Sequence, residues 1–175
     1  MSTAPFPSLK RRRHIITCTI ARPRENFSSP RNPAHRFGKT MNQPPRHPYF
    51  DDRAAVEWHR SLADAIALAQ TNGQRLLIVV STPDCGGSRA LLERVFPKEE
   101  ITEELRRGFV CVAADSRSLE AGVATLLGSA PKREPTPVCL YAVAEESGPR
   151  LLFSTAGGRP PAVFIRDLTD AHARR

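Results

Sequence analysis

Two uninterrupted runs of apolar residues, 76–80 and 109–114, constrain the fold of this chain most strongly. The first run ends in β-branched residues and is followed by Ser81, Thr82 and Pro83, which favour the end of a strand. A strand that is apolar on both sides must be covered on both faces of its sheet. The two runs therefore predict an interior sheet with helices packed above and below it.

Segments with apolar residues at helical spacing lie before and after these two strands. Residues 61–72 begin with Ser61, a helix-capping type of residue, and end before Gly73, which favours a helix C-terminus. Apolar residues recur at helical spacing over 91–96, after the segment Cys85-Gly86-Gly87-Ser88. Further helices are predicted in three other places, at residues 98–107, 118–127 and 162–173. Helices and strands thus alternate through the first half of the predicted domain, which favours a parallel arrangement there.

The second half of the pattern adds an antiparallel pair. Residues 137–144 and 151–155 predict two strands, and the turn residues of 145–150 between them predict a hairpin. The pattern at 53–58 is too weak to predict a strand. The whole order is typical of a mixed-sheet α/β sandwich.

The apolar pattern also predicts a core. The strands are expected to contribute Leu77, Ile78, Val79, Phe109, Val112, Leu140 and Leu152. The helices are expected to pack Ile66, Leu92 and Phe96 onto the sheet.

The first 48 residues have a different composition. Residues 1–48 hold ten Lys and Arg against one acidic residue, together with eight of the 16 prolines. They show no sustained apolar period, so we expect residues 1–48 to be a disordered basic tail and residues 49–175 to be the folded domain. The tail fits three roles: an organelle-targeting peptide, a segment that binds nucleic acid or anionic lipid, or upstream sequence preceding a start at Met41.

Charge and cysteine usage exclude several classes of protein. The folded part is nearly neutral, with 16 basic and 17 acidic residues, and the charge of a basic tail does not by itself read bases, so nucleic-acid binding is not favoured. The longest apolar run, 138–144, is far shorter than the roughly 20 residues of a membrane span. The four cysteines are widely spaced and form no C-x-x-C pair, which argues against a zinc site and a disulfide framework. We expect no metal or organic cofactor, and a cytoplasmic protein, or an organellar one if the tail is a transit peptide.

Cys85 is the candidate nucleophile. It precedes a predicted helix, where backbone N–H groups favour a thiolate, and Gly86 and Gly87 leave those groups without side-chain cover. Ser88 either donates a hydrogen bond to that thiolate or is an ordinary solvated serine. Cys111 and Cys139 lie inside apolar strands and are interpreted as structural.

The order of these features resembles the thioredoxin-like fold. The resemblance covers about two thirds of the chain and is carried by Trp58, residues 61–72 and 76–80, the Cys85-Gly86-Gly87-Ser88 segment with Leu91 and Phe96, residues 109–115, and Pro135-Thr136 opening a strand. The Cys-x-x-Ser arrangement is similar to the anterior gradient proteins and to bacterial single-cysteine thioredoxin-like domains. The resemblance implies that a cis-proline faces Cys85; Pro135 matches it best, and Pro137 is a second candidate.

Three positions depart from the family pattern. Ser88 replaces the second cysteine, so no resolving thiol is present to release a mixed disulfide within the molecule. Asp84 replaces the family's Trp, and apolar Val79 replaces its buried acid; both changes are expected to weaken thiolate chemistry.

Two functions follow from the resemblance. In the first, Cys85 forms mixed disulfides with protein or low-molecular-weight thiols, Ser88 assists it, and Gly86, Gly87, Pro135 and Thr136 contact the substrate. In the second, the domain is a non-catalytic interaction module. The sequence leaves the client, the electron donor and the oligomeric state open.

Overall fold

The computed structural model describes Tyr49 and residues 55–174. The predicted disordered tail at 1–48 lies outside these residues. The elements in chain order are β1 (Trp58–His59), α1 (Leu62–Asn72), β2 (Arg75–Ser81), α2 (Gly86–Ala90), η2 (a π-helix, Leu91–Val95), α3 (Glu99–Gly108), β3 (Phe109–Asp115), α4 (Ala121–Ser129), β4 (Val138–Glu145), β5 (Gly148–Ala156) and α5 (Pro161–Ala173).

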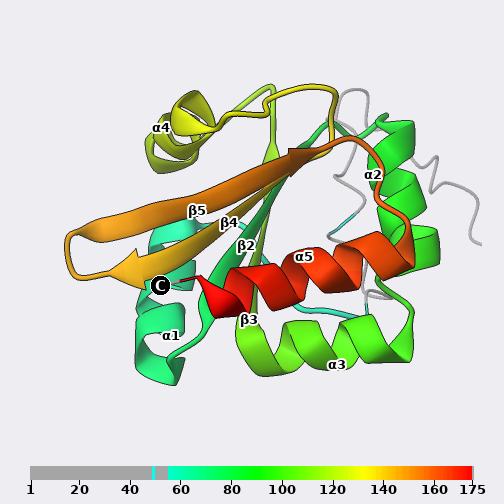
Figure 1. Cartoon of the computed structure of the whole chain (residues 1–175). Coiled ribbons are helices and arrows are strands. Elements are labelled where there is room, and N and C mark those ends of the chain that lie inside the picture. Colours follow the sequence, from blue (N-terminus) through cyan, green and yellow to red (C-terminus); the bar gives the residue numbers. More distant parts are fainter. Residues whose placement is uncertain (1–48, 50–54, 175) are drawn as a thin grey trace, which may run out of the picture. The chain divides into compact units, whose positions relative to one another are not determined.

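One five-stranded mixed sheet forms the middle layer, with the strand order β1-β3-β2-β4-β5. β3 is parallel to both β1 and β2, whereas β4 is antiparallel to both β2 and β5. The two apolar runs of the sequence are β2 and β3, which pair side by side inside the sheet (Figure 1). The predicted mixed-sheet α/β sandwich is confirmed.

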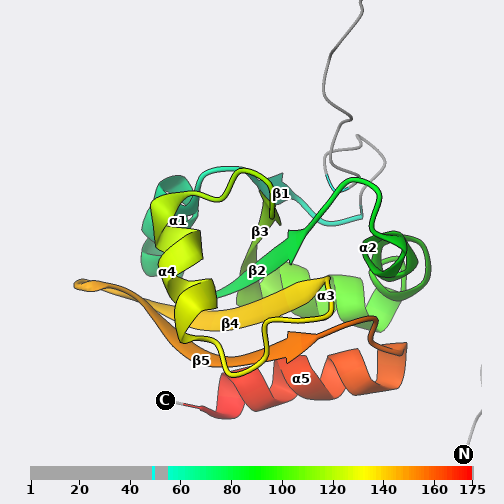
Figure 2. The ribbon, with the colours of Figure 1, turned by 90° about the horizontal axis from the view of Figure 1, so that it is seen from above.

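Helices cover both faces of the sheet. α1 and α4 lie on one side and α3 and α5 on the other, with α2 near one end of the strands (Figure 2). Each face has its own buried apolar cluster. The face under α3 and α5 includes Leu77, Val79, Phe96 and Phe164. The opposite face includes Ile78, Val80 and Val112. Burial on both faces explains why the two central strands read as continuous apolar runs.

The first helix forms as its sequence predicts. Ser61 is the N-cap of α1, and its hydroxyl accepts a hydrogen bond from the Asp64 amide at 3.3 Å. Gly73 ends the helix with φ of 65°, a left-handed conformation that glycine adopts without a steric penalty.

Other elements differ from the predicted bounds. α4 begins at Ala121 rather than at 118, and the predicted six-residue hairpin loop shortens because β4 and β5 pair as far as Glu145 and Gly148. The helix after Cys85 is not uniform, because five α-helical residues pass directly into η2. Apolar spacing alone does not distinguish these two helix types, because three- and four-residue spacing fits both.

Most of the predicted core is buried. All the predicted strand residues except Leu152 are buried, as is Phe96. Ile66 and Leu92 are half-buried and pack against the two clusters. The prediction for Leu152 is wrong: this residue is half-buried and belongs to neither cluster, because a register shift in the pairing of β4 with β5 leaves it without a partner between Leu151 and Phe153.

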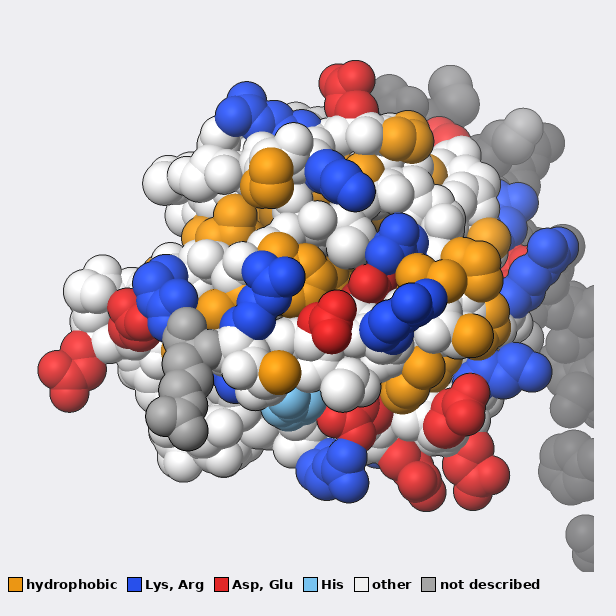
Figure 3. Space-filling view, in the orientation of Figure 1, with side chains coloured by type: hydrophobic (Ala, Val, Ile, Leu, Met, Phe, Trp, Pro, Cys, Tyr) orange, Lys and Arg blue, Asp and Glu red, His pale blue; other side chains and the backbone are white. Residues whose placement is uncertain are grey.

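The surface over α5 and β5 carries basic and acidic side chains intermixed with apolar ones (Figure 3). Such a face does not form a basic patch of the kind that binds nucleic acid. None of the helices in the described part of the chain is long and apolar enough to cross a membrane.

Candidate functional site

Cys85 is the N-cap residue of α2. The Cys85 amide donates to the Thr82 carbonyl at 3.1 Å, which closes a turn after β2, and the Cys85 carbonyl accepts from the Arg89 amide at 3.1 Å. The thiol is half-buried. The turn and the first helical bond therefore hold Cys85 at the helix start, where the sequence predicts it, with part of its side chain accessible.

The surroundings of Cys85 favour its thiolate. Burial alone would raise the pKa of Cys85, but the hydroxyl and amide of Ser88, the Thr136 hydroxyl and the Gly87 amide together lower it below its ordinary value. The Cys85 sulfur lies 3.7 Å from the Thr136 hydroxyl oxygen. A half-buried thiol with a lowered pKa is the combination that makes a cysteine a nucleophile.

Ser88 is fully buried, so it is not a solvated serine. Its hydroxyl has no hydrogen-bond partner of ordinary geometry in the part of the chain that the structure describes. It nevertheless lies close enough to Cys85 to lower the pKa of that thiol. The hydroxyl is therefore buried beside Cys85, and the thiolate is the form of Cys85 that it would stabilise.

Gly87 permits close contact with the segment before β4. A Cβ atom at position 87 would lie 2.6 Å from Cδ of Pro137 and 3.4 Å from the Thr136 carbonyl oxygen, so only glycine fits without a shift. At position 86 a Cβ atom would meet open space. Gly87, and not Gly86, is therefore the position at which the contact with Pro137 requires glycine.

The two prolines of the segment Pro135-Thr136-Pro137 have different neighbours. The peptide bonds before Pro135 and Pro137 are both cis. Pro137 is the one that lies against Gly87, whereas the Pro135 ring lies near Gly157. The Gly157 amide donates to the Pro135 carbonyl at 2.7 Å and to the Pro137 carbonyl at 2.9 Å. Of the two candidates, the structure brings Pro137, with Thr136, to the Cys85 turn.

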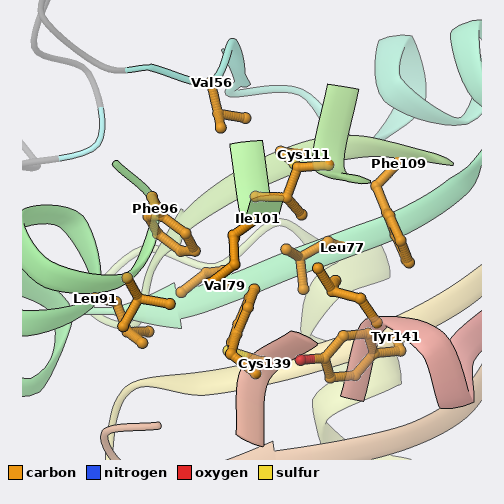
Figure 4. Close-up of a cluster of buried hydrophobic side chains, with 14 of the residues drawn as sticks. Val56, Leu77, Val79, Leu91, Phe96, Ile101, Phe109, Cys111, Cys139 and Tyr141 are labelled. Carbon is orange, nitrogen blue, oxygen red and sulfur yellow. The ribbon is translucent and has the colours of Figure 1, made fainter. Parts of the chain in front are cut away.

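The two other departures from the family pattern have different surroundings. Asp84 is exposed, and its charge helps to raise the pKa of Arg117 after the larger effect of Asp115. Asp84 does not contribute to the shift at Cys85, so the expected destabilisation of the thiolate is not found. Val79 is fully buried and pairs with Cys139 across β2 and β4, so apolar packing occupies the position of the family's acid (Figure 4).

The remaining cysteines of the described region are structural. Cys111 and Cys139 are buried in β3 and β4. Burial, together with the nearby Asp167, raises the pKa of Cys139 to about 12, and burial also raises the pKa of Cys111. No group of three or more His, Cys, Asp or Glu side chains within the described residues is arranged to hold a metal ion.

Sequence reasoning missed Tyr49. This residue is buried, and its hydroxyl donates to the Ser88 carbonyl oxygen at 3.3 Å. Tyr49 follows a proline-rich segment without a helical or alternating apolar pattern, so no periodic signal linked it to the site.

Comparison with known proteins identifies the class of this domain. A single half-buried cysteine at the start of α2, beside a Thr-Pro segment that opens a sheet strand, is set in a thioredoxin-like fold. A family model described as Thioredoxin-like matches residues 57–164, and the chain belongs to that family. Among curated protein sequences, none matches the chain significantly.

One solved structure supports the fold, and two others are similar at lower scores. A thioredoxin from Thermus thermophilus is similar with a TM-score of 0.57 and 19% identity, covering 67% of this chain and 88% of that one. DsbH oxidoreductase has a TM-score of 0.48 and 15% identity, over 77% of this chain and 95% of that one. A thioredoxin from Trichomonas vaginalis has a TM-score of 0.48 and 14% identity, over 67% and 97% of the two chains. At these identities the first likeness shows the fold alone.

Proposed function

We propose that this protein carries out thiol–disulfide exchange with Cys85 as a single nucleophile. The observation that carries the proposal is the half-buried thiol with a lowered pKa, beside a fully buried Ser88 hydroxyl that helps to lower it. The thioredoxin-like family and the likeness to a thioredoxin support chemistry of this class. The Cys-x-x-Ser arrangement is the basis for placing the protein in a single-cysteine branch similar to the anterior gradient proteins.

The reaction takes place in two exchange steps. The Cys85 thiolate attacks one sulfur of a substrate disulfide, so a bond from Cys85 to that sulfur forms and the substrate S–S bond breaks. The other substrate sulfur leaves as a thiolate and takes a proton from water. An external thiol, as its thiolate, then attacks the mixed disulfide and displaces Cys85, leaving the substrate joined to the external thiol. The protein ends in its starting state, and no electrons are gained or lost overall.

The segment before β4 is the proposed contact for the substrate backbone. Prolines have no backbone N–H, and the carbonyls of Pro135 and Pro137 both accept from Gly157. Thr136 is thus the residue of the three that keeps an N–H for pairing with an extended substrate. An open hollow lined by Glu134, Pro135 and Thr136 leaves room beside it. Gly86 and Gly87 would face the substrate from the other side, and Pro135 would shape the loop.

The proposed substrates are protein or low-molecular-weight thiols and their disulfides. A reducing compartment such as the cytoplasm suits a single reactive thiol, and an organelle is the alternative if the N-terminal segment directs transport. Arg89 is exposed one turn beyond the cysteine. An arginine on a helix surface is more often solvated than bound to a ligand, but its charge would attract an anionic thiol such as glutathione.

The test is adduct formation with glutathione disulfide. We expect the full chain to gain one glutathione on Cys85, located by peptide mass spectrometry, and Cys85→Ser to gain none on the described domain. Cys139→Ala is a matched control that removes a buried thiol and leaves the adduct unchanged. A folded protein in which Cys85 resists glutathione disulfide and alkylating reagents near neutral pH would overturn the proposal.

A non-catalytic interaction module is the second candidate. Two observations favour it: Ser88 stands where a resolving cysteine would be, and Val79 removes the buried proton acceptor. In this case Cys85 would react no faster than an ordinary thiol, so the glutathione experiment separates the two functions.

A further inference from the structure

Tyr49 lies in the apolar cluster beneath the Cys85 turn, although it precedes the segment that matches the family. It is 1% exposed, and its ring lies 4.6 Å from the Trp58 ring and 5.7 Å from the Phe96 ring, measured between centroids. Phe96 in turn follows η2 directly. These two aromatic rings therefore hold Tyr49 against the helical segment that begins at Cys85.

The Tyr49 hydroxyl contacts the residue that acts most directly on Cys85. It donates to the Ser88 carbonyl oxygen at 3.3 Å, in a buried hydrogen bond between residues 39 positions apart. Ser88 is also the residue whose hydroxyl and amide lower the pKa of Cys85. Near this carbonyl the helix changes type, since the Leu91 amide is shared between the carbonyls of Gly87 and Ser88 and η2 begins at Leu91. The Ser88 carbonyl therefore lies where the helical hydrogen-bond pattern changes, and the Tyr49 hydroxyl gives it a second donor there.

We propose that Tyr49 is a positioning residue that holds the Ser88 peptide in place, so that the Ser88 hydroxyl and amide stay directed at the Cys85 sulfur. The proposal rests on the proposed role of Cys85 as a nucleophile. A donor held in this direction stabilises the thiolate of Cys85.

Tyr49 is a donor and not a carrier of protons. Burial, the charge of Cys139 and that of Cys85 raise the pKa of Tyr49 far above its ordinary value, and the Ser88 side-chain hydroxyl only partly opposes them. The hydroxyl is therefore protonated at every pH at which Cys85 titrates. The charged residues nearest the turn are Asp84 and Arg89, both exposed, and Asp84 interacts with Arg117. These groups remain in every variant below.

The experiment compares Tyr49→Phe with Tyr141→Phe in the full chain. Phenylalanine keeps the ring and removes only the hydroxyl. Tyr141 is an equally buried tyrosine whose hydroxyl has no hydrogen-bond partner in the described domain, so it controls for the loss of a buried hydroxyl. The readout is the rate of iodoacetamide alkylation of Cys85 between pH 5 and 10, followed by mass spectrometry.

We expect Tyr49→Phe to move the midpoint of the alkylation profile to higher pH and to slow alkylation at pH 7 by about threefold, a modest effect for the loss of one hydrogen bond. Tyr141→Phe should leave midpoint and rate unchanged. The effect of Tyr49→Phe should shrink in a Ser88→Ala background, because the two residues act through one another.

Each result has a defined meaning. If wild type shows an ordinary cysteine midpoint, the proposed function fails, whatever the variants do. If wild type shows a low midpoint and Tyr49→Phe keeps it, the positioning role is overturned while the function stands. Equal shifts in Tyr49→Phe and Tyr141→Phe, or full additivity with Ser88→Ala, would also overturn it, because both point to general loosening of the core.

Discussion

Two regions of this domain place a cysteine beside hydroxyl groups, with opposite results. At the start of α2, Cys85 lies beside Ser88 and Thr136, and its pKa is lowered. In the interior of the sheet, Cys139 pairs with Thr155 across β4 and β5, and burial raises its pKa to about 12. The hydroxyls of Ser88 and Thr155 are both buried without a partner of ordinary geometry in the described region.

The difference shows that a neighbouring hydroxyl is not sufficient to activate a thiol. The Thr155 hydroxyl favours the Cys139 thiolate, but full burial and the charge of Asp167 oppose it. Cys85 is only half-buried, and backbone amides of Ser88 and Gly87 add to the two hydroxyls. Partial exposure combined with several donors decides which cysteine can react.

The largest expected effect is the selectivity of alkylation. At pH 7.5 iodoacetamide should modify Cys85 at least about a thousandfold faster than Cys139, since each unit of pKa changes the thiolate fraction about tenfold. Rates for each cysteine are measured by peptide mass spectrometry on the native chain, with a urea-unfolded sample as the control in which both react. Similar rates in the native protein would remove the contrast between the two regions.

Adding a second cysteine beside Cys85 or beside Cys139 tests whether a cysteine pair reduces disulfides only at the start of α2. Ser88→Cys places a thiol one helical turn from Cys85, near enough for a disulfide, and should convert a protein with little turnover into one that reduces insulin in the presence of dithiothreitol. Thr155→Cys creates the corresponding pair with Cys139, buried in the sheet, and should give no such activity. Mass spectrometry checks for the 85–88 bond. A folded Ser88→Cys protein with neither bond nor activity would show that Cys85 is not placed for exchange, and would favour the interaction module.

The fold was largely predictable because its signals are periodic. The apolar runs that became β2 and β3, and the capped helix between Ser61 and Gly73, follow directly from burial on two faces and from local backbone chemistry. Leu152 was misplaced because strand alternation does not reveal where the pairing register shifts.

The candidate site was only partly predictable. Cys85 and its helix start are local features, so the sequence located them. The contacts of Ser88 with Tyr49, and of Gly87 with Pro137, join residues far apart in the chain. Neither contact changes the spacing of residues along the chain, so neither can be predicted from that spacing. Pro135 was favoured over Pro137 for the same reason, because only the folded chain shows which ring lies against Gly87.

Removing the Ser88 hydroxyl should have a smaller effect than adding a thiol. Ser88→Ala takes away the strongest side-chain donor to Cys85, so the alkylation midpoint should rise and the rate at pH 7 should fall about tenfold, as expected for a hydrogen bond to a charged group. Thr155→Ala removes the corresponding hydroxyl beside Cys139 and should leave Cys85 unaffected. An unchanged midpoint in Ser88→Ala would mean that the backbone amides and the Thr136 hydroxyl stabilise the thiolate without Ser88.

The smallest effect is expected at Thr136. Its hydroxyl lies 3.7 Å from the Cys85 sulfur and lowers the pKa of Cys85 less than Ser88 does. Thr136→Val keeps the shape of the side chain and should slow alkylation at pH 7 by about threefold, since the contact is long for a hydrogen bond. Thr136→Val should also weaken the pH dependence of the free energy of unfolding. The lowered pKa of Cys85 stabilises the folded state at pH values above the thiol pKa of the unfolded chain. This stabilisation disappears as the pH falls through the thiol pKa of the folded state. Chemical denaturation at pH 6 and pH 9.5 measures this difference, with Cys85→Ser as the reference that has no thiol to titrate. A Thr136→Val protein that matches wild type in both the alkylation profile and the pH dependence would show that Ser88 and the backbone amides account for the whole contrast with Cys139.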